Sequence, residues 1–188
     1  MNRPDSAEAE LAQMSIFVVK KQYRVLTNND SADLASEQRL FSFNDLVHCA
    51  CFPDFLSNQK SMKQIAKCSS LLLQYEWILQ KMSVAFDEAQ VAASSDKLIT
   101  TRNTEQFTLE IKADNSNSEQ VYLLLSLKPS LFKSLEHENG LFLHCILKDE
   151  FKVVRFNHVI DGQAQILLEK SGGLYTMLSD ANAKIYLC

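Results

Sequence analysis

The residues that most resemble metal ligands form the run His48-Cys49-Ala50-Cys51. Thiolate and imidazole groups bind zinc, and a structural zinc site usually pairs one Cys-x₂₋₄-Cys unit with a second. Here the cysteines are one residue apart, and on a helix their side chains would point about 200° apart. Cys68 or His144-Cys145 would have to complete the set, and no spacing requires it. We therefore expect no bound metal, and we expect these thiols to be reduced side chains packed as small hydrophobic groups.

His144-Cys145 is the other pair that offers reactive groups, and it lies within a predicted strand. A cysteine nucleophile needs an imidazole beside the thiol and an exposed, electropositive setting. Neighbouring residues on a strand point to opposite faces, so Cys145 shares a face with Leu141, Leu143 and Leu147. We interpret Cys145 as a core residue and His144 as a histidine satisfied by hydrogen bonds. An enzyme of unrecognised type with a Cys145/His144 site remains the alternative.

Sequence motifs of the common enzyme classes are missing. The sequence contains no Gly-x-Ser-x-Gly elbow and no His-Glu-x-x-His zinc motif. Its four glycines are at positions 140, 162, 172 and 173, and phosphate-binding loops need glycine where the backbone approaches the anion. Walker-type and dinucleotide-fold nucleotide sites are thereby excluded. We expect a protein that is not an enzyme and that takes no cofactor.

Length and charge narrow the class further. The 188 residues are 46% hydrophobic and 22% charged, which predicts one globular domain over 1–188. The net charge is −4 and Lys20-Lys21 is the only basic doublet, so binding to nucleic acid through phosphates is disfavoured. No run of about 18 apolar residues predicts a membrane span. The first 15 residues lack a long apolar run after a basic start, so they predict no secretory signal. We expect a cytoplasmic protein without direct membrane insertion, and its five cysteines to be free thiols.

The elements that position these residues are organised around 59–95, which the sequence predicts to form one uninterrupted amphipathic helix. Apolar or small residues recur every three or four positions from Met62 to Ala93, the spacing that keeps side chains on one helical face. Further apolar residues widen this stripe: Leu73, Trp77, Val84 and Val91. Because a sheet covers an arc of only about 100° or a little more, we expect either the N-terminal helix or a partner to cover the excess.

Helices are predicted before this segment and strands after it. A helix is expected over 6–26, and Ser42 with Asp45 predicts the capped start of a second helix that ends near Pro53. After Ser95 the apolar period changes to two. Strands are expected at 107–111, 121–128, 141–148, 151–160, 163–169, 174–179 and 183–187, with a short helix at 130–137.

Short connections join antiparallel neighbours, so the C-terminal half is predicted to be a meander sheet. The resulting fold class is α+β, with a mainly helical part at 1–95 and a mainly antiparallel β part at 96–188. The predicted main core joins the long helix to this sheet through Leu72, Leu79, Phe86, Leu109, Ile111, Leu123 and Leu125.

In size, acidity and order of elements, the chain resembles small acidic bacterial secretion chaperones and adaptors, and in particular adaptors of the Dot/Icm type IVB coupling complex. The resemblance is one of general build over the whole chain and includes no motif, so no site residues are carried over from it. It implies partners among other chaperone subunits, secreted effectors and the tail of the coupling ATPase.

These observations favour a non-enzymatic protein-binding adaptor or chaperone subunit of a larger complex. Tyrosine and tryptophan are frequent anchors at protein interfaces, so the predicted partner-binding residues are Trp77, Leu73, Val84 and Val91, together with a sheet edge. A structural subunit of a eukaryotic complex is a further alternative.

Overall fold

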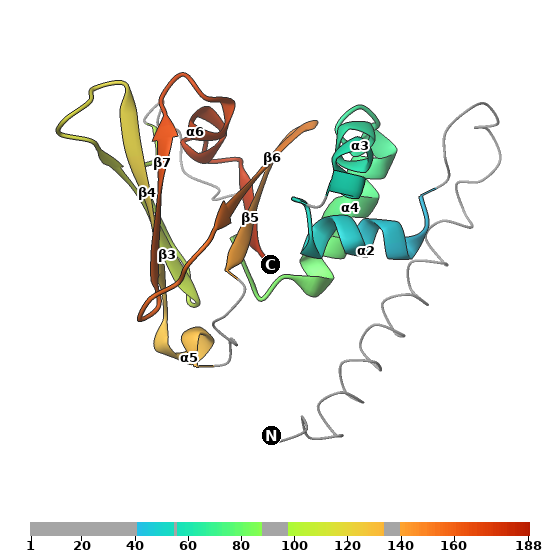
Figure 1. Cartoon of the computed structure of the whole chain (residues 1–188), viewed down its shortest axis with the longest axis horizontal. Helices are drawn as coiled ribbons and strands as arrows, with labels where there is room; N and C mark the ends of the chain where they lie inside the picture. Colours follow the sequence, from blue (N-terminus) through green and yellow to red (C-terminus); the bar gives the residue numbers. More distant parts are fainter. Residues whose placement is uncertain (1–40, 55, 88–97, 134–139) are drawn as a thin grey trace.

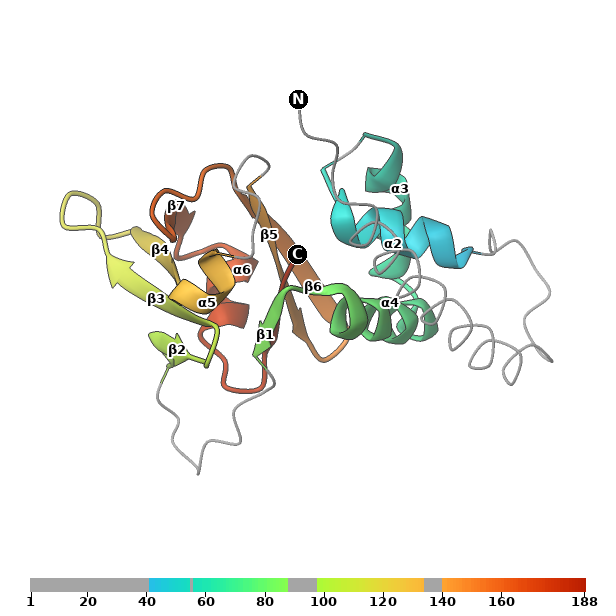
Figure 2. The same cartoon turned by 90° about the horizontal axis from the view of Figure 1, so that it is seen from below.

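The computed structural model describes residues 41–54, 56–87, 98–133 and 140–188. The helix predicted over 6–26 lies outside these residues. The described chain forms three layers (Figures 1 and 2). A helical layer covers one face of a four-stranded sheet, the inner sheet, whose other face packs on a second four-stranded sheet, the outer sheet. The α+β class is thus confirmed.

The helical layer contains α2 (Phe43–Cys51), α3 (Leu56–Ile65) and α4 (Ser69–Met82). Helix α2 begins with the predicted capping box, because the Ser42 hydroxyl accepts the Asp45 N–H at 3.2 Å and the Asp45 carboxylate accepts the Ser42 N–H at 3.0 Å.

The single helix predicted over 59–95 is wrong. Helix α3 ends at Ile65, where Lys67 and Cys68 donate their N–H groups to carbonyls three residues earlier, at 3.1 and 3.3 Å. This tighter turn ends the α-helical ladder, and the extended Cys68 backbone starts α4 in a new direction. After Met82 the chain becomes a strand, β1 (Ala85–Asp87). The rest of the predicted helix, 88–95, lies outside the described residues.

The strand order of the inner sheet is β1-β8-β5-β6, where β8 is Lys184–Leu187, β5 is Leu141–Leu147 and β6 is Glu150–Phe156. The order of the outer sheet is β2-β3-β4-β7, where β2 is Thr101–Asn103, β3 is Phe107–Ala113, β4 is Gln120–Leu127 and β7 is Gln163–Glu169. All the strand pairs are antiparallel.

The predicted meander is therefore wrong in its topology. Strand β7 does not pair with β6, which precedes it in sequence, but with β4 in the outer sheet. Strand β8 returns to the inner sheet and lies between β1 and β5. Two short helices complete the sandwich, α5 (Pro129–Phe132) and α6 (Gly173–Leu178). Helix α5 starts at the proline as expected, whereas α6 replaces the strand predicted over 174–179. Its buried residues, Met177 and Leu178, are adjacent in sequence, so they do not follow a strand's alternation.

Two separate cores hold the layers together. Leu109, Leu123 and Leu125 are buried between the two sheets, as predicted. Leu72 and Leu79 are also buried, but between the helical layer and the inner sheet, where they share a cluster with Ile146 and Tyr186.

Two of the predicted core residues differ. Ile111 is half-buried at the edge of the core between the sheets. Phe86 is 43% exposed, because strand alternation turns it away from its buried neighbours Ala85 and Asp87. Its ring stacks on Tyr186, with 6.4 Å between the centroids.

Candidate protein-binding surfaces

His144 and Cys145 do not form a thiol–imidazole pair. Cys145 points into the core between the sheets, where burial raises the pKa of its thiol to about 12. His144 is fully buried on the opposite face of β5, below the helical layer, and burial lowers its pKa to about 4. The structure therefore gives the Cys145 thiol neither the exposure nor the base that a nucleophilic cysteine needs.

His144 instead links the inner sheet to the helices. The Tyr75 hydroxyl lies 3.0 Å from His144 Nδ1 and 3.4 Å from the Cys49 carbonyl. Within the described part of the chain, His144 Nε2 is buried without a hydrogen-bond partner. A neutral imidazole is compatible with these surroundings, because it carries no charge that burial would penalise.

The run His48-Cys49-Ala50-Cys51 is packed by its own neighbours in the helical layer. His48 Nδ1 is hydrogen-bonded to the side chain of Asn58. Burial raises the pKa of Cys49 to about 11 and that of Cys188 to about 12. In the described ranges, no three His, Cys, Asp or Glu side chains are grouped closely enough to hold a metal ion.

Of the four predicted partner-binding residues, the three that the structure describes do not lie on one surface. Leu73 is 66% exposed and lies one helical turn from the half-buried Trp77, which packs on the helical core. Val84 lies beyond the end of α4 and packs against the other core, between the sheets. Val91 lies outside the described residues. Among the three described residues, only Leu73 and Trp77 share a face, the outer face of α4.

A buried arginine that the sequence analysis did not single out connects the two sheets. Arg102 on β2 donates from Nη1 to the Asp87 carboxylate and to the Ala183 carbonyl, both at 3.1 Å. It also donates to the carbonyl of Leu178, the last residue of α6, and to that of Asp180, two residues later. Because these partners come from segments far apart in sequence, no local pattern could have revealed the site.

A second polar group anchors α4 on the inner sheet. The buried Glu76 carboxylate accepts hydrogen bonds from the Lys184 ammonium and, at 3.1 Å, from the Tyr186 hydroxyl. Its charge is therefore paired inside the structure, and we assign it a structural role.

The ends of the sheets offer surfaces of a different kind. Strands β1 and β2 contain three residues each, and they lie at the same flank of the sandwich. Strands β6 and β7 contain seven residues each, and they end the two sheets at the opposite flank, at the front of Figure 1. A long unpaired edge presents a row of backbone N–H and C=O groups that can pair with another chain.

The open edge of β6 is defined by the register of its neighbours. Phe142 exchanges both of its backbone hydrogen bonds with Cys188, at 2.8 and 2.9 Å, so the N–H and C=O groups of Phe142 point towards β8. By alternation the backbone N–H and C=O groups of Leu143 point towards β6, where Leu143 pairs with Val154. The backbone groups of Phe151 and Val153 consequently point away from β5, and none of the described residues is hydrogen-bonded to them there.

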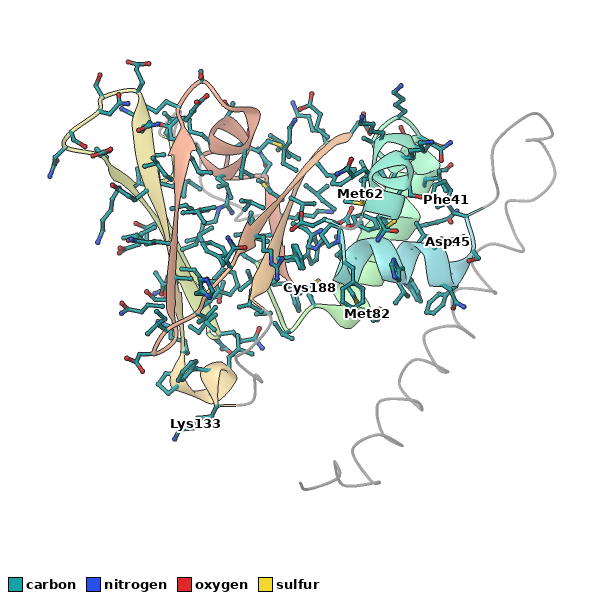
Figure 3. The ribbon with its side chains drawn as sticks, in the orientation of Figure 1. Phe41, Asp45, Met62, Met82, Lys133 and Cys188 are labelled. Atoms are coloured by element: carbon teal, nitrogen blue, oxygen red, sulfur yellow. The ribbon has the colours of Figure 1, made fainter. Side chains whose placement is uncertain are left out.

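A groove runs beside this edge. It has a volume of about 300 Å³ and is lined by Pro53, Asp54, Gln59, Met62, Lys63, Phe151, Lys152 and Val153. The turn after α2 and helix α3 form one wall, and β6 forms the other. Figure 3 shows Met62 on the side of α3 that lies towards β6, and the Phe151 ring packs on Tyr75 with 5.5 Å between the centroids.

The wall formed by α3 is basic in a protein whose net charge is −4. Its sequence, LSNQKSMKQI, contains two lysines and no carboxylate, and both lysines, Lys60 and Lys63, are exposed. Across the groove, Arg155 lies 4.0 Å from Asp54 and its guanidinium is 5.3 Å from the centre of the Phe142 ring. The groove thus combines an apolar floor, a backbone edge and a cationic wall.

A larger hollow of about 790 Å³ lies over the outer sheet. Its lining includes Glu110 and Leu124 from the sheet and Asn157, His158 and Ile160 from the β6–β7 connection. The polar and apolar groups alternate without a buried, convergent set, so this hollow has no feature of a small-molecule site.

Comparisons with protein-family models, with curated proteins and with solved structures find no match to this chain. Among the described residues, no helix is long and apolar enough to cross a membrane.

Proposed function

We propose that this chain is a non-enzymatic adaptor or chaperone subunit that binds an extended segment of a partner protein along the open edge of β6. The observation that carries the proposal is the groove between β6 and α3, where unpaired backbone groups lie beside an apolar floor. Strand addition at a sheet edge uses these two features, because backbone hydrogen bonds supply affinity and alternate side chains supply specificity.

The groove also favours a particular partner chemistry. An added strand would direct alternate side chains towards α3, where Met62 and Phe151 provide an apolar contact and Lys63 a positive charge. We therefore expect an extended segment in which an apolar side chain enters the groove and a nearby carboxylate pairs with α3.

The affinity of such a segment should be modest. Each backbone hydrogen bond contributes roughly 0.5–1.5 kcal/mol net, and one buried apolar side chain contributes about 1.5–3 kcal/mol. After the cost of ordering a flexible segment, we expect a dissociation constant on the order of micromolar. Such an affinity suits an adaptor that releases its partner. The resemblance to secretion adaptors supports a partner among bacterial effectors or coupling-complex subunits.

The experiment selects binders from a random peptide library and measures their affinities by calorimetry. Two variants alter the groove. Met62→Glu places a negative charge on the α3 wall of the groove. Val153→Pro removes an N–H that faces away from β5, a position at which an edge strand tolerates proline. The matched control, Leu73→Glu, adds the same charge on the exposed outer face of α4.

We expect selected peptides to combine apolar and acidic residues, and we expect both groove variants to weaken binding at least ~10-fold while Leu73→Glu does not. Peptides that bind the groove variants as well as the wild type would overturn the proposed site. If Leu73→Glu or Trp77→Ala removed binding instead, the outer face of α4 would be the interface.

A further inference from the structure

Strand β7 forms the other long open edge, and it lacks the usual protection against pairing. Edge strands of natural proteins commonly carry lysine, proline or a bulge that discourages the addition of another strand. The sequence of β7 is QAQILLE, without lysine or proline, and its only charge is Glu169 at the end. By contrast, β6 (EFKVVRF) contains two basic residues and an acidic one.

Hydrogen bonds show which groups of β7 face outward. Gln163 exchanges both of its backbone bonds with Ile160, each at 2.8 Å, across the tight turn at Asp161-Gly162. The backbone N–H and C=O groups of Gln163 therefore point away from β4. By alternation the backbone groups of Gln165 and Leu167 point the same way. Among the described residues, none donates to or accepts from the outward backbone groups of these two.

We propose that β7 pairs antiparallel with β7 of a second copy of this chain, with Leu167 on the two-fold axis. In this register the Leu167 backbone groups bond to their symmetry mates. Gln165 and Glu169 of the other copy form the next pair, in which each N–H donates to the carbonyl of its partner. The two outer sheets then become one continuous sheet. This dimer goes beyond the proposed adaptor function and does not depend on it.

The side chains in this register are self-complementary, as a two-fold interface requires. Leu167, which is 47% exposed, is covered by its own symmetry mate. The Gln165 amide lies opposite the Glu169 carboxylate and can donate to it, and Ile166 lies opposite Leu168. No like charges face each other, so no pair opposes the association.

The same geometry disfavours the register centred on Ile166. Centring the two-fold axis on Ile166 would place Glu169 of one copy against Gln163 of the other, where Ile160 already occupies the edge. With Leu167 on the axis, the strand of the second copy ends before this position. After Glu169 the chain turns, since the Gly172 N–H donates to the Glu169 carbonyl at 2.9 Å.

The test is sedimentation velocity of the full chain over a wide concentration range. Leu167→Lys places two ammonium groups together at the axis, and Gln165→Pro removes an outward N–H without removing a bond to β4. The control, Gln163→Lys, adds the same charge on the same strand and face, at a position whose edge Ile160 already occupies. Circular dichroism and thermal unfolding verify that each variant is folded.

We expect the wild type and Gln163→Lys to dimerise as the concentration rises, and Leu167→Lys and Gln165→Pro to dimerise at least ~10-fold more weakly. Hydrogen exchange on the wild type gives a second readout that requires no folded variant. The outward amides of β7, those of Gln165, Leu167 and Glu169, should become protected with concentration, while those of the central strand β4 should not change. A wild type that stays monomeric, or a dimer that both edge variants retain with unprotected β7 amides, would overturn the proposal.

Discussion

Acidification should destabilise this protein through His144. The imidazole is buried beneath the helical layer, and burial lowers its pKa from 6.5 to about 4. In the unfolded chain the same group takes up a proton near its ordinary pKa. Because the unfolded state then binds more protons than the folded state, stability falls as the pH decreases through the window from 6.5 to about 4.

The size of this effect follows from the two pKa values. Between pH 7 and pH 5, protonation of the unfolded imidazole lowers the free energy of unfolding by about 2 kcal/mol, and the folded state recovers almost none of this. The Tyr75 hydroxyl at Nδ1 does not reverse the sign, since it is neutral and hydrogen-bonds the uncharged ring.

The assay is urea unfolding of the wild type and of His144→Asn at both pH values. Asparagine keeps a polar partner for Tyr75 but does not titrate, so the fall in stability from pH 7 to pH 5 should be smaller in the variant by about 2 kcal/mol. His158→Asn is the matched control, because His158 is exposed and its replacement alters no buried group. Equal pH dependence in wild type and His144→Asn would refute the reasoning.

Two further predictions concern stability. Arg102→Met should lower the free energy of unfolding by about 3–5 kcal/mol, because it leaves the buried Asp87 carboxylate and several carbonyls unpaired. Lys112→Met, which breaks the exposed pair with Glu110, should cost less than about 1 kcal/mol; equal losses in chemical denaturation would contradict this account. Leu79→Ala should cost about 2–5 kcal/mol, and a loss below about 0.5 kcal/mol would show that this site is not core.

Local sequence signals predicted the parts of the fold that local interactions determine. The capping box at Ser42 and Asp45 involves residues three positions apart, and the structure contains it. The alternation from Phe107 to Ile111 belongs to one half-buried strand, and the apolar run from Val121 belongs to β4, which pairs on both sides.

The failures arise where distant contacts decide the structure. No glycine or proline marks the break at Ala66–Cys68, and the apolar period continues through it. The sequence therefore predicts one helix where the structure has two, and these pack on each other and on α2. Likewise the segment 174–179 is rich in residues that suit a strand, and only its place above the sandwich core makes it helical.

The candidate site was predicted only in kind. The sequence analysis anticipated a sheet edge as a binding element, but which strands end the sheets follows from pairings such as Val121 with Leu168 that join distant segments. It could not anticipate that α3 would lie beside β6, because the helix predicted over 59–95 merged α3 with α4. Leu73 and Trp77 remain exposed enough on α4 to keep their place in the proposed test.

The position of β8 has a consequence for the speed of folding. This strand lies between β1 and β5, and it pairs Leu187 with Ala85 on one side and with Leu143 on the other. Strands β1 and β5 do not pair with each other, and both pair with β8. The inner sheet is therefore completed only when the C-terminal strand reaches both of them. Pairing β1 with β8 closes the loop formed by the chain between Asp87 and Lys184, and this closure costs conformational entropy before the strand contacts form. We therefore expect the β5–β6 hairpin to form early and β1 to join last, in a slow final phase.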